Sequence, residues 1–241
     1  MKTIAVVAVP PVKSFDLSMP ETLMGGVMVD GEPAYRVVVC TAEPGVLPST
    51  PGGFDVVIRH GLDVLDAADA VIVPSTGSRT DADPVTLKAL RAAVDRGVLV
   101  TSICSGAFVL AQAGLLDGRT ATTHWGLADE LAKAHPLVRV RVDALFIEDG
   151  PVTTAAGAAA GIDLCLHLIR ADYGATVANA AARAAVVTPV RQAAKPNSST
   201  RPYPPTTTSR SRPPGRGRSN ASTLPCHYAN SPNTHEQACA P

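Results

Sequence analysis

Apolar residues gather in short runs with little polar alternation. The runs TIAVVAV (3–9) and YRVVVCT (35–41) are rich in β-branched residues, and AVIVPS (70–75) and VLVTSI (98–103) are continuously apolar. Such runs are typical of strands that are covered on both faces of a sheet. The pattern therefore predicts a strand at each of these four places.

Between the last two runs, the segment DADPVTLKALRAAVDRG has apolar residues that recur every three or four positions. Pro84 stands near its start and Gly97 ends it, as in a helix. A strand, a helix and a second strand in this order predict a parallel pair with a right-handed crossover. Helices are also expected over 126–134 and 161–174, and a hairpin over 138–156 with its turn at Asp149-Gly150. We predict an α/β fold, with a mostly parallel sheet and helices on both faces.

The apolar pattern ends at about Ala193. Residues 193–241 contain nine Pro and one Leu, and no Val, Ile, Met, Phe or Trp. Such a segment buries too little apolar surface to offset its conformational entropy, so we expect a disordered tail rich in Pro, Arg, Ser and Thr. The tail holds six of the 21 Lys and Arg residues and one of the 21 acidic residues, which leaves residues 1–192 at a net charge of about −5. This α/β domain offers no broad basic surface for a polyanion.

Three features indicate a cytoplasmic protein without a membrane partner. The start MKTIAVVAV lacks the order of a signal peptide, and no apolar stretch reaches the ~20 residues that span a bilayer. The five cysteines are an odd number without regular spacing, which suits a reducing compartment better than a disulfide framework.

The segment TSICSGAFVLAQAGLLDGRTATTHWG (101–126) carries the candidate chemistry. Cys104 stands between a predicted strand and a predicted helix, and the small residues Ser102 and Gly106 lie two positions before and after it. This is the pattern of a nucleophile elbow, a sharp turn that exposes a reactive side chain. The N–H groups at the helix start, around Ser105, would lower the thiol pKa and hold an oxyanion. The alternative is a buried, inert cysteine.

This segment resembles the elbow of the ThiJ/PfpI superfamily, whose fold is similar to that of the flavodoxin-like class I glutamine amidotransferases. Its closest resemblance is to the branch that forms the N-terminal half of AraC-type transcriptional regulators. The segments DLSMPE (16–21), GLDVLDAADAVIVPS (61–75) and AAGAAAGIDLCLHLIRADYGATVANAAAR (155–183) resemble the same branch. The resemblance covers about residues 1–192.

The resemblance implies that an acidic residue approaches the sulfur, and both Asp16 and Glu21 stand in the right segment. The Asp-Leu-x-x-Pro context, similar to that of isonitrile hydratases, favours Asp16. Alternatively, Asp16 only caps a helix that begins at Leu17. In relatives, a histidine at the place of His124 faces the cysteine; a structural histidine is the alternative. Trp125 is expected to pack against the protein.

The loop PSTGS (74–78) places the backbone N–H groups of Thr76 and Gly77 opposite the elbow, where they would form the second half of an oxyanion hole. Because ligands of such sheets bind beyond the carboxyl ends of the strands, we expect a pocket there. Asp163 is expected near a helix start, not beside His124, so no complete Cys-His-acid triad is predicted. Cys165 and His167 are expected in the core. The remaining Cys and His residues lack zinc-finger spacing, and we predict neither a metal nor a cofactor; they are Cys226, His227, His235 and Cys239.

Two functions remain open. The first is the ligand-sensing or redox-sensing, dimerising half of an AraC-family regulator, with a small-molecule effector. In this interpretation, residues 193–241 are a frameshift product that replaces a helix-turn-helix domain; the alternative is a genuine disordered extension. In either case the chain is not expected to bind DNA specifically. The second is an enzyme of the isonitrile hydratase, amidase or deglycase type, in which Cys104 attacks an electrophilic carbon.

Overall fold

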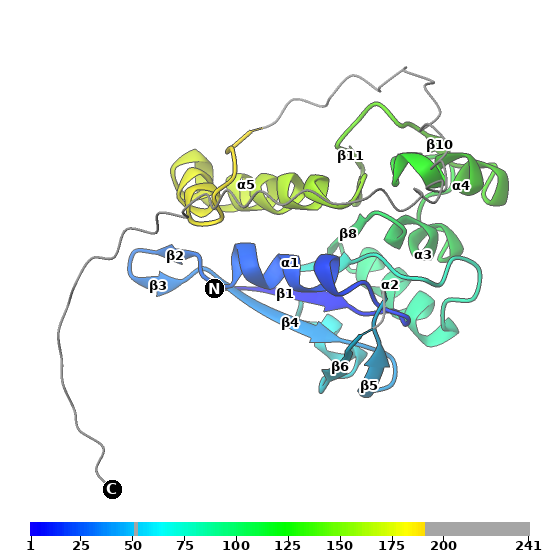
Figure 1. Ribbon diagram of the computed structural model, residues 1–241, viewed down its shortest axis with the longest axis horizontal. Helices are drawn as coiled ribbons and strands as arrows, with labels where there is room; N and C mark the ends of the chain where they lie inside the picture. The colour runs from blue at the N-terminus through cyan, green and yellow to red at the C-terminus, as the bar shows by residue number, and fades with distance from the viewer. Residues whose placement is uncertain (51–52, 191–241) are drawn as a thin grey trace, which may run out of the picture. The chain divides into compact units, whose positions relative to one another are not determined.

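The computed structural model describes residues 1–50 and 53–190 (Figure 1). The predicted tail from residue 193 lies outside the described residues. The strands are β1 (Lys2–Val7), β2 (Met28–Val29), β3 (Glu32–Pro33), β4 (Tyr35–Cys40), β5 (Gly45–Pro48), β6 (Asp55–Ile58), β7 (Ala70–Val73), β8 (Leu99–Ile103), β9 (Thr120–Ala121), β10 (Arg139–Val140), β11 (Phe146–Asp149) and β12 (Val152–Ala155). The helices are α1 (Ser14–Met24), α2 (Pro84–Asp95), α3 (Gly106–Gln112), α4 (Ala128–Ala134) and α5 (Ala159–Ala184), with short 3₁₀ turns η1 (Leu62–Ala67) and η2 (Trp125–Leu127).

A six-stranded sheet organises the chain, in the order β11-β12-β8-β7-β1-β4. All neighbours in it are parallel except β11, which runs antiparallel to β12 at one edge. The four strands predicted from the apolar runs are β1, β4, β7 and β8, and they lie side by side. The predicted α/β fold with a mostly parallel sheet is therefore confirmed.

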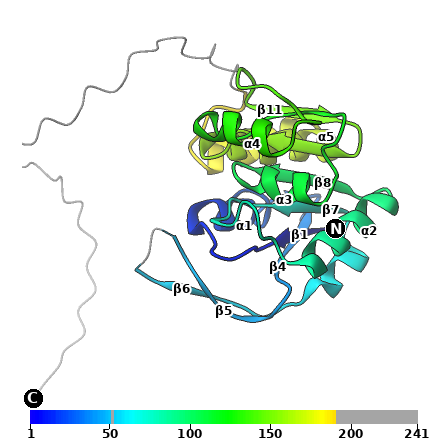
Figure 2. The same cartoon turned by 90° about the vertical axis from the view of Figure 1, so that its right-hand side faces the viewer.

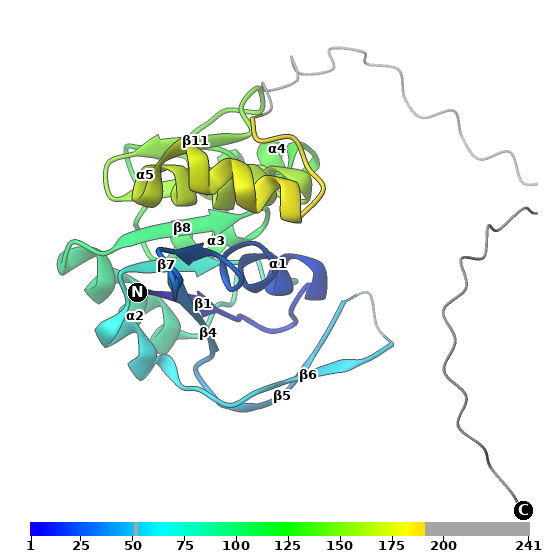
Figure 3. The ribbon, with the colours of Figure 1, turned by 90° about the vertical axis from the view of Figure 1, so that its left-hand side faces the viewer.

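Two separate apolar cores cover the two faces of this sheet. One core joins side chains of α1 and α5 to alternate strand residues such as Ile4, Ile72 and Ile103. The other joins η1, α2 and α3 to residues of opposite parity, such as Ala5 and Val71. Figure 2 shows α2 and α3 in front of the sheet, and Figure 3 shows α1 and α5 from the other side. Burial on both faces explains why these strands read as continuous apolar runs.

Helix α2 follows the expected pattern at its start. Asp83 accepts a hydrogen bond from the Val85 N–H at 2.6 Å, and Pro84 occupies the first turn, where its missing N–H costs nothing. Gly97, two residues past the helix, has a φ of +81°. The crossover from β7 through α2 to β8 therefore forms as its local signals indicate.

The expected hairpin over 138–156 is only partly present. Its second half forms β11 and β12, but β10 pairs in parallel with β9 as a separate two-stranded sheet. The turn is also displaced by one residue, because Asp149 pairs with Val152 and leaves Gly150 and Pro151 at the tip. Gly150 has a φ of +68°, which explains a glycine there. The valines within 138–142 match the local pattern of a strand. However, this segment pairs with β9 and does not form the first strand of the expected hairpin.

Three features have no counterpart in the prediction. The strands β5 and β6 form a two-stranded ribbon that extends away from the main sheet (Figures 2 and 3), and β2 and β3 form a smaller one. Helix α5 runs beyond the predicted end at 174 and breaks at Gly174, which has a φ of +81°.

Within the described residues, no helix combines the length and the apolar character that crossing a membrane requires.

Candidate functional site

Cys104 occupies the sharp turn between β8 and α3. Its φ of +56° is a left-handed conformation that costs a non-glycine residue free energy, as expected at a nucleophile elbow. The Cys104 N–H donates to the Ala155 carbonyl at 2.8 Å, which holds the turn against β12. A Cβ atom on Gly106 would lie 2.2 Å from the Val73 carbonyl oxygen. Glycine is therefore required two residues after Cys104, because α3 passes directly over the end of β7.

The loop between β12 and α5 closes over the cysteine. A Cβ atom on Gly157 would lie 2.3 Å from the Cys104 Cβ and 2.9 Å from its sulfur. On another side, the Thr123 hydroxyl donates to the Cys104 carbonyl oxygen at 2.8 Å. Cys104 is half-buried, and its side chain packs at the edge of the α1/α5 core. The alternative of a fully buried cysteine therefore does not hold.

The other described cysteines are different. Cys40 and Cys165 are buried, and burial raises the pKa of each thiol to about 12. At neutral pH these two side chains are neutral thiols with little nucleophilic character. Among the described residues, Cys104 is thus the one cysteine in a position to react.

The predicted oxyanion donors are both engaged. The Thr76 N–H donates to the Ser105 hydroxyl oxygen at 3.0 Å, and the Gly77 N–H donates to the Pro11 carbonyl at 2.8 Å. Ser105 in turn donates to the Thr76 carbonyl at 2.7 Å. The β7 loop does lie against the elbow, as the sequence suggested. However, its N–H groups stabilise that contact and do not point into open space, so the predicted second half of the oxyanion hole is not formed.

Asp16 is a buried carboxylate in the first turn of α1. The helix begins at Ser14 and its cap is Lys13, so the alternative that Asp16 caps a helix starting at Leu17 is wrong. The Asp16 side chain is 5% exposed and accepts a hydrogen bond from the Ser75 hydroxyl. Burial raises the pKa of the Asp16 carboxyl, and the Ser75 hydrogen bond and the charges of Lys13 and His124 oppose this in part.

Asp16 is therefore joined to the elbow through two adjacent residues. Ser75 bonds to Asp16, and its neighbour Thr76 bonds to Ser105, the residue after Cys104. Ser75, Thr76 and Ser105 are all buried. Ser75 was not identified from the sequence, although it stands in the PSTGS loop. The useful signal would have been a hydroxyl residue two positions after the end of a buried strand.

Glu21 does not join this group. It is exposed on α1, and its carboxylate lies beside Gly25, where an added Cβ would be 2.5 Å from the Glu21 Oε1. Five residues separate Glu21 from Asp16, which turns the two side chains to different sides of the helix at 3.6 residues per turn. Of the two acidic candidates, Asp16 is the one held against the β7 loop.

His124 lies just before η2 and is half-buried. Its Nδ1 accepts a hydrogen bond from the Gly126 N–H at 3.2 Å, which agrees with the structural alternative for this residue and leaves Nε2 for another partner. Its charge is near enough to lower the pKa of Asp16, although less than Ser75 does. Trp125 was expected to pack, but it is 76% exposed, and its ring lies 5.3 Å from that of His124. The expectation for Trp125 was wrong.

The remaining candidates lie on α5. Asp163 is buried near the start of this helix, as predicted. Cys165 is in the core, but His167 is only partly buried and its Nε2 lies 2.8 Å from the Glu148 carboxylate on β11. The core assignment therefore holds for Cys165 alone. Within residues 1–50 and 53–190, no cluster of acidic, His and Cys residues has the arrangement of a metal site. The Cys and His residues of 226–239 lie outside the described part.

A half-buried thiol, a buried carboxylate and a partly free imidazole therefore belong to three segments that meet around the elbow. Such a set can form hydrogen bonds to a small polar ligand and can move a proton. It does not present an arranged pair of N–H donors from the β7 loop. Two cavities of the described residues lie away from the elbow, one between β4 and the segment 57–60 and one between α1 and α5.

Comparison with known proteins places these features in a family. The family model described as the DJ-1/PfpI family matches residues 2–171. The HTH-type transcriptional regulator CdhR of Pseudomonas aeruginosa is 38% identical over 146 residues, which are 60% of this chain and 43% of that protein. An isonitrile hydratase of Pseudomonas putida is 38% identical over 96 residues, which are 40% of this chain and 41% of the enzyme. The chain thus spans about two fifths of the length of these relatives.

Solved structures give the same fold. An AraC family transcriptional regulator from Pseudomonas putida superposes with a TM-score of 0.66 at 19% identity. The match covers 76% of this chain and 98% of the other. At this identity, the likeness establishes the arrangement of the elements and nothing about ligands.

Proposed function

The chain belongs to the DJ-1/PfpI family, and from this premise we propose that its α/β domain, residues 1–192, is the sensing half of an AraC-type transcriptional regulator. In this proposal, the elbow region binds a small-molecule effector without consuming it, and the domain forms a homodimer in the cytoplasm. Sequence likeness to the regulator CdhR supports the regulatory role. Residues 191–241 are outside the described part, so the loss of a DNA-binding half stays a prediction.

The observation that carries this choice is the state of the β7 loop. An acyl-transfer or hydratase site gains much of its rate from donors that are already aimed at the developing charge. Here the Thr76 and Gly77 N–H groups are bonded to Ser105 and Pro11. An enzyme would have to break these bonds in each turnover, whereas a binding site gains rigidity from them. The geometry therefore favours recognition over catalysis.

In the proposed sensing site, the carboxyl, the imidazole and the thiol each contact the ligand, and none has to react with it. Asp16 offers a buried carboxyl that accepts from a polar ligand or, when protonated, donates to it. His124 offers Nε2, and Cys104 offers a thiol that also serves as an oxidation-sensitive point. An effector that contacts all three links α1, the β8–α3 turn and the segment before η2. By linking these segments, the bound effector would change their relative positions and so transmit its binding to another domain.

The test is a thermal-shift screen of polar metabolites, followed by calorimetry on each ligand that stabilises the protein. A ligand at 100 times its Kd stabilises a protein by about 2.7 kcal/mol. Binding should weaken in Asp16→Asn and Cys104→Ala and remain unchanged in Asp129→Asn, an exposed residue of α4. The ligand should be recovered intact, and the protein should sediment as a dimer at micromolar concentration. A strict monomer, or a ligand that is consumed, contradicts the proposal.

The second candidate is a cysteine-dependent hydratase, favoured by the match to isonitrile hydratase together with Asp16, Cys104 and His124. The reaction adds water across the terminal carbon of an isocyanide and gives an N-substituted formamide. Asp16 or His124 would deliver the proton, and the oxygen would come from water. Turnover of an alkyl isocyanide that falls by orders of magnitude in Cys104→Ala would establish this function in place of the first. An amide and a glyoxal should be assayed in the same way, because amidase and deglycase activities are the other forms of the enzyme alternative.

A further inference from the structure

The main sheet has an open edge at β4. The carbonyls of Ala34 and Cys40 accept hydrogen bonds from Lys2 and Ala8, so the even-numbered residues of β4 direct their backbone groups toward β1. Alternate residues of a strand bond to opposite edges, so Val37 and Val39 direct their N–H and C=O groups away from β1. Within the described residues, Val37 has no strand partner on that side. Pairing occurs only at the end of β4, where Cys40 and His60 form an isolated parallel bridge that engages the Val39 carbonyl and the Thr41 N–H, the latter donating to the His60 carbonyl at 3.1 Å.

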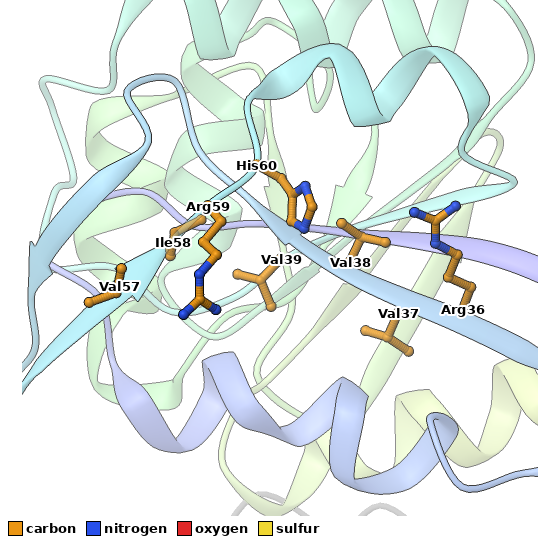
Figure 4. A pocket seen from close by; sticks show the side chains of 8 residues that line it. All are labelled: Arg36, Val37, Val38, Val39, Val57, Ile58, Arg59 and His60. Carbon is orange, nitrogen blue, oxygen red and sulfur yellow. The ribbon is translucent and has the colours of Figure 1, made fainter.

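A cavity of about 330 Å³ lies along this open edge. It is lined by β4 and by the segment that leaves the β5–β6 ribbon (Figure 4); the residues are Arg36, Val37, Val38, Val39, Val57, Ile58, Arg59 and His60. The backbone groups of Val37 and the N–H of Val39 therefore face a space that the described residues leave empty of chain. Exposed edges of this kind are templates for an additional strand.

The polar side chains around the cavity are basic, and the others that line it are valines and an isoleucine. Arg36, Arg59 and His60 are exposed, and among the described residues neither arginine forms an ion pair. Figure 4 shows Arg36 and His60 on one side of the β4 ribbon, while the Arg59 side chain points to the side of Val37 and Val39. A strand added to this edge would point its successive side chains alternately to these two sides. Acidic residues at adjacent positions would thus meet Arg36 on one side and Arg59 on the other.

We propose that this cavity binds an extended acidic peptide segment of a partner protein, which adds a strand to the sheet at β4. Main-chain hydrogen bonds to Val37 and to the N–H of Val39 supply affinity, and the two arginines select carboxylate side chains. The surface lies at the β4 edge of the sheet, whereas the elbow lies at the carboxyl end of the inner strand β8, and the proposal does not depend on the function assigned to Cys104. It gives the domain a means of contacting a second protein component.

The experiment uses fluorescence anisotropy of the full chain with three labelled hexapeptides. The first, Val-Glu-Glu-Val-Glu-Val, has adjacent acidic residues and a complete set of backbone donors. The second replaces every Glu with Lys, and the third replaces every Val with Pro, which keeps the charge but removes N–H groups. The protein variants are Arg36→Glu with Arg59→Glu, and Lys88→Glu on α2 as a control at an exposed position outside the cavity.

We expect the acidic peptide to bind in the micromolar range at low salt, and binding to weaken about tenfold or more with the Lys peptide, the Pro peptide and the double arginine variant. The Lys88→Glu protein should bind as the wild type does. Thermal unfolding verifies that each variant is folded, and Arg36→Gln with Arg59→Gln replaces the charge reversal if it is not. Three results would overturn the proposal: no binding at about 1 mM, equal binding of the Pro peptide, or a homodimer that the arginine substitutions dissociate.

Discussion

The Ser105 hydroxyl donates to the Thr76 carbonyl at 2.7 Å and accepts from the Thr76 N–H at 3.0 Å. One side chain thus satisfies both backbone groups of a buried loop residue. Because Ser105 follows Cys104 directly, this pair fixes the elbow against the loop after β7. The same loop holds Asp16 through Ser75. The position of the candidate thiol therefore depends on a small buried network of hydroxyl groups.

Substitution Ser105→Ala should destabilise the domain by about 2 kcal/mol, because the N–H and C=O groups of Thr76 would lose their partner while buried. For a domain of this size, the melting temperature falls by roughly 2–4 °C per kcal/mol. Urea unfolding followed by circular dichroism measures the loss. The control is Ser18→Ala, since the exposed Ser18 hydroxyl only bonds to the Phe15 carbonyl of its own helix. Equal effects of the two substitutions would mean that the Ser105 pair contributes little.

Substitution Gly157→Ala should displace Cys104. The new methyl group would stand 2.3 Å from the Cys104 Cβ, and the φ of +96° is unfavourable for alanine. Gly118→Ala is the matched control, since its φ of +71° also strains alanine while no atom lies within 4 Å of the new Cβ. Overpacking adds about 1–3 kcal/mol, so Gly157→Ala should be less stable than Gly118→Ala by that amount. Similar stabilities of the two variants would show that the loop before α5 moves to accommodate the new methyl group at little cost in free energy.

The pKa of Asp16 links stability to pH. Burial raises it above the ordinary value of 3.8, so the native protein holds a proton that the unfolded chain has already released. The free energy of unfolding should therefore fall as the pH rises from 3.8 through the native pKa, and remain lower above it. Asp16→Asn removes this titration and keeps an acceptor for Ser75. The variant should gain stability relative to wild type as the pH rises from 4 to 8.

Urea unfolding at several pH values measures this difference. Asp129→Asn serves as the reference, because Asp129 is exposed in the first turn of α4. Its stability should follow that of the wild type across the range. A wild-type protein that becomes more stable relative to Asp16→Asn as the pH rises would contradict the assignment of burial as the dominant cause.

The features that the sequence predicts well are those that follow from short local sequence patterns. The elbow can be predicted because the small residues Ser102 and Gly106 stand two positions before and after Cys104. The strands are readable because burial on both faces leaves few polar residues in them. The position of α2 follows from Asp83 and Pro84. Each of these features depends on residues that are neighbours along the chain.

What the sequence does not predict depends on contacts between distant segments. Thr76 and Ser105 are 29 residues apart, and no local pattern indicates that their groups satisfy each other. Trp125 is apolar enough to suggest packing, but the turn η2 directs it outward to 76% exposure. The valines near 140 match a strand, yet β10 pairs with β9 because the chain brings them together. In each case the structure depends on how distant segments are arranged, and not on the local pattern of the sequence.

The described cysteines should differ sharply in reactivity. Iodoacetamide at pH 7.5 should label Cys104 in the folded protein and leave Cys40 and Cys165 unmodified, since burial shields both thiols and raises the pKa of each to about 12. Mass spectrometry of the three tryptic peptides measures the labelling at each site. In urea, all three should react at similar rates. Labelling of Cys165 before Cys104 in the folded protein would contradict the half-buried position of the elbow thiol.

Trp125 should report on the occupancy of the proposed site. It is the one tryptophan of the chain, it is 76% exposed, and its ring lies 5.3 Å from that of His124. The free protein should therefore emit at the long wavelength of a solvated indole. A ligand that contacts His124 should remove water from the ring and shift the emission to shorter wavelength. Titration gives a Kd that must agree with calorimetry, and Asp16→Asn should weaken both equally. Calorimetric binding without any change in emission would place the ligand away from His124.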